Sequence, residues 1–407
     1  MLENYRECVL NIRPNVINIS GDSIMNQRDH YVITGGAGFL GSQLIAALQK
    51  NGDMTQCVVI DPSPPRHYDN IQFDRAFVTY VQEKFQEDHV LDSVLPNAST
   101  VFHLCSIGHT GKYGARRYQD EVYKINVKGT EKLISKCRKY KVPRFIYSSS
   151  IAVVFVGKPL FDVTEEMPYP EDHEFLDIYS KTKAEAEKCI ISQSCPEFKT
   201  TCLRFRAIYG PQDSVVAEKV VNMVGMNFFR MKICRESEET SSNMSSGRNC
   251  GLALHLANQA LMDERKPHGK AYFIHDGEEI QQYAVWTPLI KALGKQPPTF
   301  RCPYFLVSPF IALISFFCHE ILKISPPMTR FELEVLVTTN TYSIEAAKRD
   351  LDYRPTGNHF QEAVDYYRVD SKDKIEAHQP TAYLDYDDLI FILILLLWTV
   401  SLLWSSH

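Results

Sequence analysis

The chain of 407 residues is predicted to form a doubly wound α/β fold, in which helices cover both faces of a parallel sheet. Short apolar runs alternate with longer helical patterns over the first half of the chain. A glycine-rich turn joins the first of these runs to the first helix. An uncharged run near the C-terminus adds a predicted transmembrane helix to this fold.

The predicted strands are short, apolar and bounded by polar residues or glycine. The predicted helices lie between them, with apolar residues at the helical period. Parallel strands need a crossover connection, so this alternation predicts a parallel sheet. The strands are His30–Thr34, Cys57–Asp61, Ala76–Val81, Val101–Cys105, Phe145–Ser149 and Thr200–Arg204, and the helices are Phe39–Lys50, Val122–Tyr140 and Leu176–Ile191.

The composition is that of an ordinary folded protein. Hydrophobic residues make up 44% and charged residues 23% of the chain, which excludes a wholly disordered or collagen-like protein. The formal net charge is −5 and no basic stripe stands out, so nucleic-acid binding is not expected. The 11 cysteines include no pair with the spacing of a zinc knuckle or a redox motif. They are predicted to be reduced thiols, and no metal site is expected.

The two ends of the chain differ in character. Residues 1–28 form an N-terminal extension that lacks the apolar core of a signal peptide. Leu389–Trp404 is a run of 16 residues without a charge. As a helix it would be roughly 24 Å long, a little short of the hydrocarbon core of a bilayer. We expect residues 385–407 to form a C-terminal membrane anchor, with the rest of the chain in the cytosol; a buried core helix is the alternative.

Two further segments have unusual composition. Tyr304–Cys318 is apolar, has Pro309 in its middle and is too short to span a bilayer comfortably. It is either a core helix or a segment that dips into one face of a membrane. Residues 236–247 are polar, with Met244 as the only large apolar residue, and are predicted to form a mobile loop.

The glycine-rich turn carries the strongest local signal. Thr34–Gly41 has the sequence TGGAGFLG, which places Gly35, Gly38 and Gly41 three residues apart. Glycine is needed where a backbone turns tightly and where it approaches a pyrophosphate without a Cβ. The helix that follows would aim its first N–H groups at the phosphates. Because the motif ends a predicted strand and opens a predicted helix, it indicates a dinucleotide-binding turn.

A carboxylate in the next strand indicates which dinucleotide binds. Asp61 lies 20 residues after Gly41, at the end of the second predicted strand. A carboxylate there accepts hydrogen bonds from the adenosine ribose and repels a 2′-phosphate. The sequence therefore favours NAD over NADP, although Arg66 is close enough in sequence to offer a phosphate a partner.

A tyrosine and a lysine are the catalytic candidates. Tyr179 and Lys183 are spaced i, i+4, so both project from one face of a predicted helix. A nearby ammonium favours the phenolate, which would give a general base for an alcohol proton. Ser148–Ser150 ends a strand about 30 residues upstream, where a hydroxyl can bind the substrate oxygen. Tyr80 and Lys84 have the same spacing but lie on a predicted strand and its end.

Taken together, these motifs resemble the extended short-chain dehydrogenase/reductase superfamily. Within it, the chain is most similar to the 3β-hydroxysteroid dehydrogenase/isomerase branch and to the group called family 42E. The resemblance covers roughly residues 31–367. It is carried by Thr34–Gly41, Asp61, VFHLCS at Val101–Ser106, NVKGT at Asn126–Thr130, SSSIAV at Ser148–Val153, YSKTKAEAE at Tyr179–Glu187, LRFRAIYGP at Leu203–Pro211 and, for the branch, Thr329–Pro355.

The resemblance implies a role for each site residue. Ser150 would be the catalytic hydroxyl, Tyr179 the base, and Lys183 both its helper and the group that holds the nicotinamide ribose. Asn126 would support the architecture of the active site. The pyrophosphate turn would comprise Gly35, Gly36, Ala37, Gly38, Phe39, Leu40 and Gly41, with Asp61 on the adenosine ribose.

The resemblance also implies how the chain is divided. Residues 29–212 would form a Rossmann-type NAD-binding domain and residues 213–369 a smaller substrate-binding region. Residues 370–384 would link this region to the membrane anchor. The implied partners are NAD, a lipophilic substrate such as a steroid or sterol, a membrane, with the endoplasmic reticulum as the leading choice, and a second copy of the chain in a homodimer.

The expected activity is NAD-dependent interconversion of a hydroxyl and a ketone on that lipophilic substrate. Two alternatives remain open at this point. One is a nucleotide-sugar epimerase or reductase, in which Arg204 and Arg206 could bind a diphosphate. The other is an NAD-binding membrane protein with impaired catalysis, because residues 236–250 depart from the family's pattern in the region that lines the substrate pocket of relatives.

Overall fold

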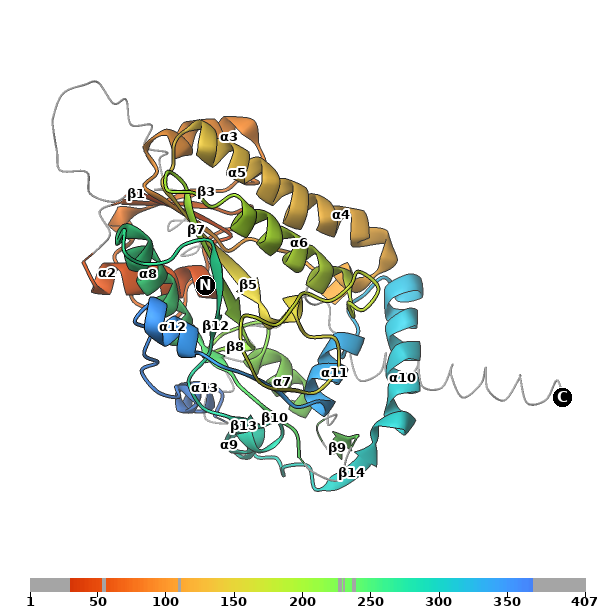
Figure 1. The fold of residues 1–407 in the computed structure, drawn as a ribbon. Coiled ribbons are helices and arrows are strands. Elements are labelled where there is room, and N and C mark those ends of the chain that lie inside the picture. The colour runs from red at the N-terminus through yellow and green to blue at the C-terminus, as the bar shows by residue number, and fades with distance from the viewer. Residues whose placement is uncertain are drawn as a thin grey trace, which may run out of the picture.

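The computed structural model of the chain describes residues 30–52, 56–108, 111–225, 229, 231–235 and 239–368. The predicted N-terminal extension, linker and membrane anchor lie outside these residues. The main sheet has seven strands, all parallel, in the order β12-β7-β5-β4-β1-β2-β3 (Figure 1). The strands are β1 (His30–Thr34), β2 (Gln56–Ile60), β3 (Val78–Val81), β4 (Thr100–His103), β5 (Arg144–Ser150), β7 (Lys199–Phe205) and β12 (Lys270–Ile274).

Helices bury both faces of this sheet (Figure 1). Within β1, Tyr31 and Ile33 pack into the layer with α2, α8 and α12, whereas Val32 faces the layer with α3, α5 and α6. Burial on both faces explains why the strands read as continuous apolar runs. The helices are α2 (Phe39–Lys50), α3 (Asp88–Val94), α5 (Thr130–Lys139), α6 (Ile178–Ser192), α8 (Gly247–Met262) and α12 (Glu345–Asp350).

The predicted elements are present, with bounds shifted by up to three residues. The predicted helix Val122–Tyr140 is not uniform: α4 (Gln119–Tyr123) and α5 are joined by a π-helical turn, Lys124–Gly129. Strand β12 lies beyond residue 212 in the sequence and pairs with β7 in parallel. The main sheet therefore extends past the proposed boundary between the NAD-binding domain and the substrate-binding region.

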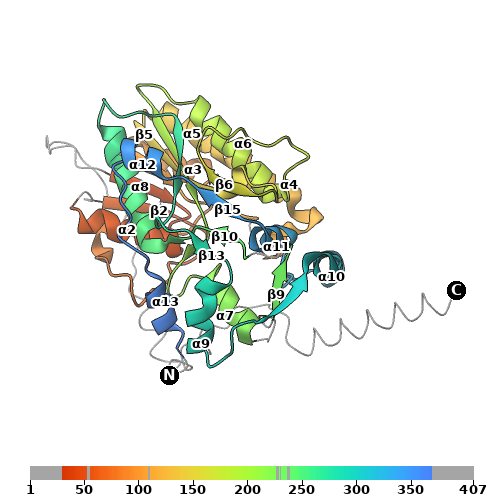
Figure 2. The same cartoon turned by 60° about the horizontal axis from the view of Figure 1, so that its bottom comes forward.

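Smaller elements gather beyond one end of the main strands (Figures 1 and 2). A second sheet has the strand order β13-β10-β15-β6, and β8 pairs with β11 and β9 with β14. The strands are β6 (Leu160–Val163), β8 (Ile208–Tyr209), β9 (Met231–Cys234), β10 (Ser241–Ser242), β11 (Ser245–Ser246), β13 (Ile280–Gln281), β14 (Phe300–Pro303) and β15 (Asn340–Tyr342); the helices are α7 (Ala217–Gly225), α9 (Thr287–Ala292), α10 (Tyr304–Phe316), α11 (Arg330–Val337) and α13 (Phe360–Tyr366).

The interpretation of residues 236–247 as a mobile loop is wrong for residues 241–247. Ser242 and Ser245 are fully buried in β10 and β11. Burial of a serine is tolerated when its hydroxyl has a partner. Ser245 Oγ donates to Ile274 O at 2.7 Å, and Ser246 caps α8 by accepting a hydrogen bond from Asn249 N. The polar composition therefore reflects hydrogen bonding inside the fold.

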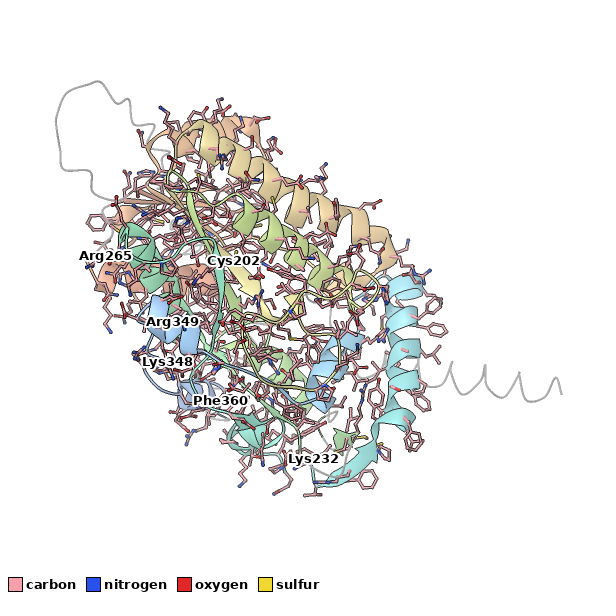
Figure 3. All side chains as sticks on the ribbon, in the orientation of Figure 1. Cys202, Lys232, Arg265, Lys348, Arg349 and Phe360 are labelled. Atoms are coloured by element: carbon pink, nitrogen blue, oxygen red, sulfur yellow. The ribbon has the colours of Figure 1, made fainter. Side chains whose placement is uncertain are left out.

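The apolar run at Tyr304–Cys318 forms α10, which continues into a π-helical turn, Phe317–Leu322. The interpretation of this run as a core helix is wrong, because no residue of α10 is buried and five of its large apolar side chains are exposed. By length and composition, Tyr304–Leu322 is the single candidate membrane span among the described residues, with a mean hydropathy of 1.9. Side chains along α10 project away from the body of the molecule (Figure 3).

Candidate active site

The turn between β1 and α2 has no room for side chains at two of its glycines. Gly35 has a φ of +72°, and a Cβ there would lie 2.6 Å from the Cα of Cys105. A Cβ on Gly41 would lie 2.2 Å from the carbonyl oxygen of Gly36. Both distances are far below van der Waals contact, so only glycine allows α2 to start this close to β1.

Gly38 differs from these two glycines because a Cβ there would meet no atom within 4 Å. Gly38 is the N-cap of α2, whose first N–H groups have no acceptor within the helix. Open space beside a helix N-terminus fits a pyrophosphate. The seven residues predicted to contact this group, Gly35 to Gly41, lie in this turn and in the first turn of α2.

The ring of Phe39 closes one side of the turn. A Cβ on Gly210 would come within 2.5 Å of this ring, and a Cβ on Gly247 within 2.6 Å. Gly210 follows β8, and Gly247 is the first residue of α8. The first turn of α2 therefore packs directly on segments from beyond the glycine-rich motif.

Asp61 lies beside the same turn, at the carboxyl end of β2. Its Oδ2 accepts a hydrogen bond from Ala37 N at 3.2 Å, and its Oδ1 accepts one from Ser63 N at 2.9 Å. The backbone N–H of Arg66 donates to Ala37 O at 3.2 Å. These bonds hold a carboxylate where a dinucleotide on the turn would place its adenosine ribose.

The structure brings the predicted catalytic residues together. Ser150 ends β5, and Tyr179 and Lys183 lie one turn apart at the start of α6. The Tyr179 phenol is hydrogen-bonded to the side chains of Ser150 and Ser106. Lys183 is buried; its Nζ donates to Ser148 O at 2.5 Å and lies 5.9 Å from the centre of the Tyr179 ring.

Burial dominates the protonation of both groups. Burial, followed by the carboxylate of Asp177, raises the pKa of the Tyr179 phenol above its ordinary value, and the hydrogen bonds with Ser150 and Ser106 act in the opposite direction. Burial lowers the pKa of Lys183 to about 7. The expectation that Lys183 lowers the pKa of the phenol is therefore corrected, because burial raises that pKa and Lys183 is not among the groups that shift it. The Tyr179 phenol therefore keeps its proton near neutral pH.

Asn126 lies in the π-helical turn and connects two parts of the site. Its Oδ1 accepts a hydrogen bond from Ile107 N at 2.9 Å, and its Nδ2 donates to Ile107 O at 2.8 Å. Nδ2 also lies 3.0 Å from the Oγ1 of Thr182, which precedes Lys183 on α6. Asn126 thus fixes the segment after β4 relative to the helix that carries Tyr179.

A buried histidine that sequence reasoning missed extends this network. Thr130 Oγ1 donates to Asn126 O at 2.6 Å and so accepts from His103 Nε2, 2.9 Å away. His103 Nδ1 then accepts from Thr34 Oγ1 at 2.6 Å. Burial lowers the pKa of His103 to about 3, which keeps the ring neutral. His103 also interrupts an apolar strand, a signal that could have identified it.

The two arginines considered for a substrate diphosphate are buried and already engaged. Arg204 Nη2 lies 2.7 Å from Glu187 Oε1, so its charge is compensated inside the protein. Arg206 Nε donates to Asn340 Oδ1 at 2.9 Å. Neither arrangement presents a guanidinium to an open surface.

Sequence comparison relates the chain to known proteins. The profile of the 3-beta hydroxysteroid dehydrogenase/isomerase family matches residues 32–303. A 3beta-hydroxysteroid dehydrogenase/Delta(5)-Delta(4) isomerase 1 of Caenorhabditis elegans is 33% identical over 312 residues, covering 77% of this chain and 66% of that protein. Short-chain dehydrogenase/reductase family 42E member 1 of Xenopus laevis is 30% identical over 397 residues, covering 95% of this chain and 100% of that protein.

Solved structures share the fold. The UDP-glucuronic acid 4-epimerase of Bacillus cereus, in complex with NAD, has a TM-score of 0.61 and 20% identity, covering 83% of this chain and 98% of that one. A UDP-glucose 4-epimerase of Thermotoga maritima has a TM-score of 0.60 and 18% identity, covering 85% and 99%. These structures support the Rossmann-type architecture. Because the family profile spans well over half of the sequence, the chain belongs to the 3-beta hydroxysteroid dehydrogenase/isomerase family.

Proposed function

We propose that the chain is an NAD-dependent oxidoreductase that interconverts a hydroxyl group and a ketone on a lipophilic substrate, with a steroid or sterol as the leading class. The observation that carries this proposal is the cluster of Ser150, Tyr179 and Lys183 at the carboxyl edge of the main sheet. Membership of the family supports the reaction. Relatives named 3β-hydroxysteroid dehydrogenases support the substrate class.

NAD is the dinucleotide that this site fits. The open space at Gly38 and the N-terminus of α2 suit its pyrophosphate, and the Asp61 carboxylate suits the hydroxyls of its adenosine ribose. Lys183 would hold the nicotinamide ribose. Several solved structures with this fold contain NAD. When bound, the nicotinamide exchanges a hydride with the substrate carbon.

Tyr179 and Ser150 would handle the substrate oxygen. Ser150 Oγ hydrogen-bonds to this oxygen, and the Tyr179 hydroxyl transfers a proton to or from it. In ketone reduction the phenol donates its proton, and its raised pKa keeps that proton in place beforehand. In alcohol oxidation the phenol must first lose its proton, and the ammonium form of Lys183 then stabilises the phenolate.

The two alternatives receive less support. A nucleotide-sugar enzyme would need cations for a diphosphate, but Arg204 is paired with Glu187 and Arg206 is bound to Asn340. A protein with a lost pocket wall would show a gap where residues 239–250 instead form two buried strands and the start of a helix. The structural likeness to epimerases supports a shared fold and does not identify the substrate.

The remaining expectations are part of the same proposal. Residues 385–407 would anchor the protein in a membrane, that of the endoplasmic reticulum first, with the catalytic part in the cytosol. Residues 213–369 would contribute most of the substrate contacts, and two copies of the chain would form a homodimer.

The test is NADH formation by the full-length protein with a panel of 3β-hydroxysteroids, comparing the unchanged chain with Tyr179→Phe. Tyr80→Phe is the matched control, because it removes the same hydroxyl from the second Tyr-Lys pair in the sequence. We expect Tyr179→Phe to lower kcat by about 10²- to 10⁴-fold and to leave NAD binding unchanged. Full activity in Tyr179→Phe would overturn the site, and NAD binding without any turnover would favour the binding-only alternative.

A further inference from the structure

We propose that Tyr147 is a positioning residue, and that the face of its aromatic ring holds the ammonium form of Lys183 where a carboxylate counter-ion would otherwise be needed. Lys183 Nζ lies over this ring, 4.3 Å from its centre. An ammonium within about 6 Å of a ring centre is attracted by the negative charge of the ring face, and more strongly when both groups are out of water. Tyr147 and Lys183 are each 1% exposed, so this condition is met.

Hydrogen bonds and ion pairs alone leave the Lys183 ammonium poorly compensated. Its Nζ donates to Ser148 O at 2.5 Å. An ammonium carries three N–H donors, so one carbonyl leaves the others to face a different electron-rich group. Of the ion pairs in the described part of the chain, none includes Lys183. A buried charge with so little compensation is costly, and the Tyr147 ring supplies what the carboxylates do not.

The titratable groups around Lys183 are neutral near pH 7, with one exception. Burial raises the pKa of the phenol and of the two thiols among them, and it lowers the pKa of the histidine to about 3. The exception is Glu187, which lies one turn further along α6. The neutral neighbours are Tyr179 on α6, His103 in β4, Cys105 after β4 and Cys202 in β7.

Glu187 is already engaged by a different cation. Arg204 Nη2 lies 2.7 Å from Glu187 Oε1, and Tyr169 OH donates to the same oxygen at 2.7 Å. The other carboxylate oxygen, Oε2, makes no hydrogen bond to any described residue, so it does not reach Lys183. The charge of Glu187 is therefore balanced by Arg204. The Ser148 carbonyl and the Tyr147 ring remain as the groups that contact the ammonium.

Contacts on the Tyr147 ring fix its orientation. The His103 ring stacks on it, with ring centres 5.5 Å apart and an angle of 27° between the planes. His103 is held in turn by the hydroxyls of Thr34, 2.6 Å from Nδ1, and Thr130, 2.9 Å from Nε2. Because these bonds fix the imidazole, they also fix the ring that stacks on it. The site for the ammonium is therefore formed before a cofactor binds.

The ring of Tyr147, and not its hydroxyl, is the part that this site uses. The hydroxyl is buried and has no hydrogen-bond partner among the described residues, an arrangement that costs free energy. Burial raises the pKa of this phenol well above its ordinary value, so it carries no charge that could attract Lys183. Phenylalanine has a comparable ring face without the hydroxyl. Tyr147→Phe therefore separates the two parts of the side chain.

The test measures the pKa of Lys183 in the full-length, NAD-free protein by denaturant unfolding over a range of pH. Each form of the chain is compared with the same form carrying Lys183→Met. Below the pKa of folded Lys183 the two differ by a constant free energy, because the folded and the unfolded chain both hold the proton. Above it the difference falls as the pH rises. The pH at which the fall begins is therefore this pKa, about 7 in the unchanged chain.

Three variants of β5 test the ring. Tyr147→Leu removes it and Tyr147→Phe keeps it. Phe145→Leu is the matched control, because it removes another fully buried ring from the same face of β5, two residues away. We expect Tyr147→Leu to move the start of the fall to lower pH by about 0.5 to 1.5 units, as a desolvated interaction of this kind implies. The other two variants should leave it unchanged.

A start at the same or a higher pH in Tyr147→Leu would overturn the proposal. An equal shift in Tyr147→Phe would overturn it as well, because the hydroxyl would then be responsible. If Tyr147→Leu does not fold, a difluorinated phenylalanine at position 147 replaces it, because fluorine withdraws charge from the ring face and nearly preserves its shape. The pKa of Lys183 should then lie below that in Tyr147→Phe, and an equal value in the two would refute the role of the ring.

The consequence for turnover rests on the proposed function, in which Lys183 acts as an ammonium. NADH formation near pH 7 should fall several-fold more in Tyr147→Leu than in Tyr147→Phe. Absence of turnover in every form, including the unchanged chain, would count against the proposed function. It would leave the measured pKa values, and the decision on Tyr147, as they are.

Discussion

The side-chain amide of Asn126 is hydrogen-bonded to both backbone groups of Ile107, accepting from its N–H at 2.9 Å and donating to its carbonyl oxygen at 2.8 Å. An amide can make both bonds at once, because its oxygen accepts while its NH2 group donates. The pair fixes the segment after β4, whose Ser106 contacts Tyr179. The first prediction follows from this clamp.

Asn126→Ala should lower kcat by about 10- to 100-fold, since small displacements of catalytic groups have effects of that size. The KM for NAD should change little, because the glycine-rich turn and Asp61 are not touched. Steady-state kinetics measure both constants. Thr182→Val, which removes the contact between Asn126 and α6 and the bond from Thr182 Oγ1 to the backbone oxygen of Tyr179 but keeps the bonds to Ile107, is the control and should have a smaller effect on kcat. A rise in the KM for NAD with normal kcat would contradict this role for Asn126.

Two glycines of the turn should behave in opposite ways when replaced by alanine. Gly38→Ala should fold normally, since its Cβ meets no protein atom within 4 Å, yet weaken NAD binding by about 10-fold or more. Gly41→Ala should lose stability, because its Cβ would lie 2.2 Å from a carbonyl oxygen of the turn. Thermal unfolding without NAD and titration with NAD separate the two effects. Tight NAD binding by Gly38→Ala would show that the pyrophosphate does not lie at this glycine.

Asp61 should determine the choice between NAD and NADP. Replacing it with serine removes a charge that would repel a 2′-phosphate and two hydrogen bonds to ribose hydroxyls. Asp61→Ser should weaken NAD binding by about 10- to 100-fold, as expected for bonds to a charged acceptor, and improve binding of NADP. Dissociation constants for both dinucleotides test this. Asp69→Ser, at an exposed position, should leave both constants unchanged.

Lys183 should make stability depend on pH. Burial holds its pKa at about 7, against 10.5 for an ordinary lysine. Between these values the unfolded chain binds more protons than the folded one, so stability rises with pH across this window. Lys183→Met should therefore raise the free energy of unfolding of the NAD-free protein by on the order of 4 kcal/mol near pH 7. This gain should shrink as the pH rises to 10.5 and vanish above it, because the unfolded chain then loses its proton as well.

Denaturant unfolding of both proteins at several pH values measures this gain. Lys188→Met, an exposed position on the same helix, is the matched control and should show no such trend. A gain for Lys183→Met that stayed constant with pH would mean that packing, and not the buried charge, is responsible.

The main sheet was predictable because its strands are buried on both faces and therefore read as apolar runs, as in Val32 and Ile33 of β1. The two-residue strands β10 and β11 could not be predicted from the sequence. Their serines carry no local signal of burial, and the bonds from Ser245 to Ile274 and from Ser242 to Asn340 come from distant parts of the chain. Such contacts exist only once the fold has formed.

The candidate site divides in the same way. The spacing of Tyr179 and Lys183 is a local pattern, and so is the glycine-rich turn. Sequence reasoning could therefore identify both motifs and place Tyr179 next to Lys183. Ser106 and His103 act through neighbours on other elements, and no spacing in the sequence predicts those contacts. The C-terminal run that carries the predicted anchor lies outside the described residues, and its role stays a prediction.

The packing of Phe39 between Gly210 and Gly247 has a consequence for how mutations would be interpreted. Any side chain introduced at either glycine must displace the aromatic ring that supports the start of α2. Substitutions at these positions would therefore be detected as a loss of cofactor affinity, although neither glycine belongs to the cofactor motif. The start of α2 is therefore mechanically linked to the segments after β8 and at the start of α8, and redesign of either segment would have to spare this ring or replace it together with both of its neighbours.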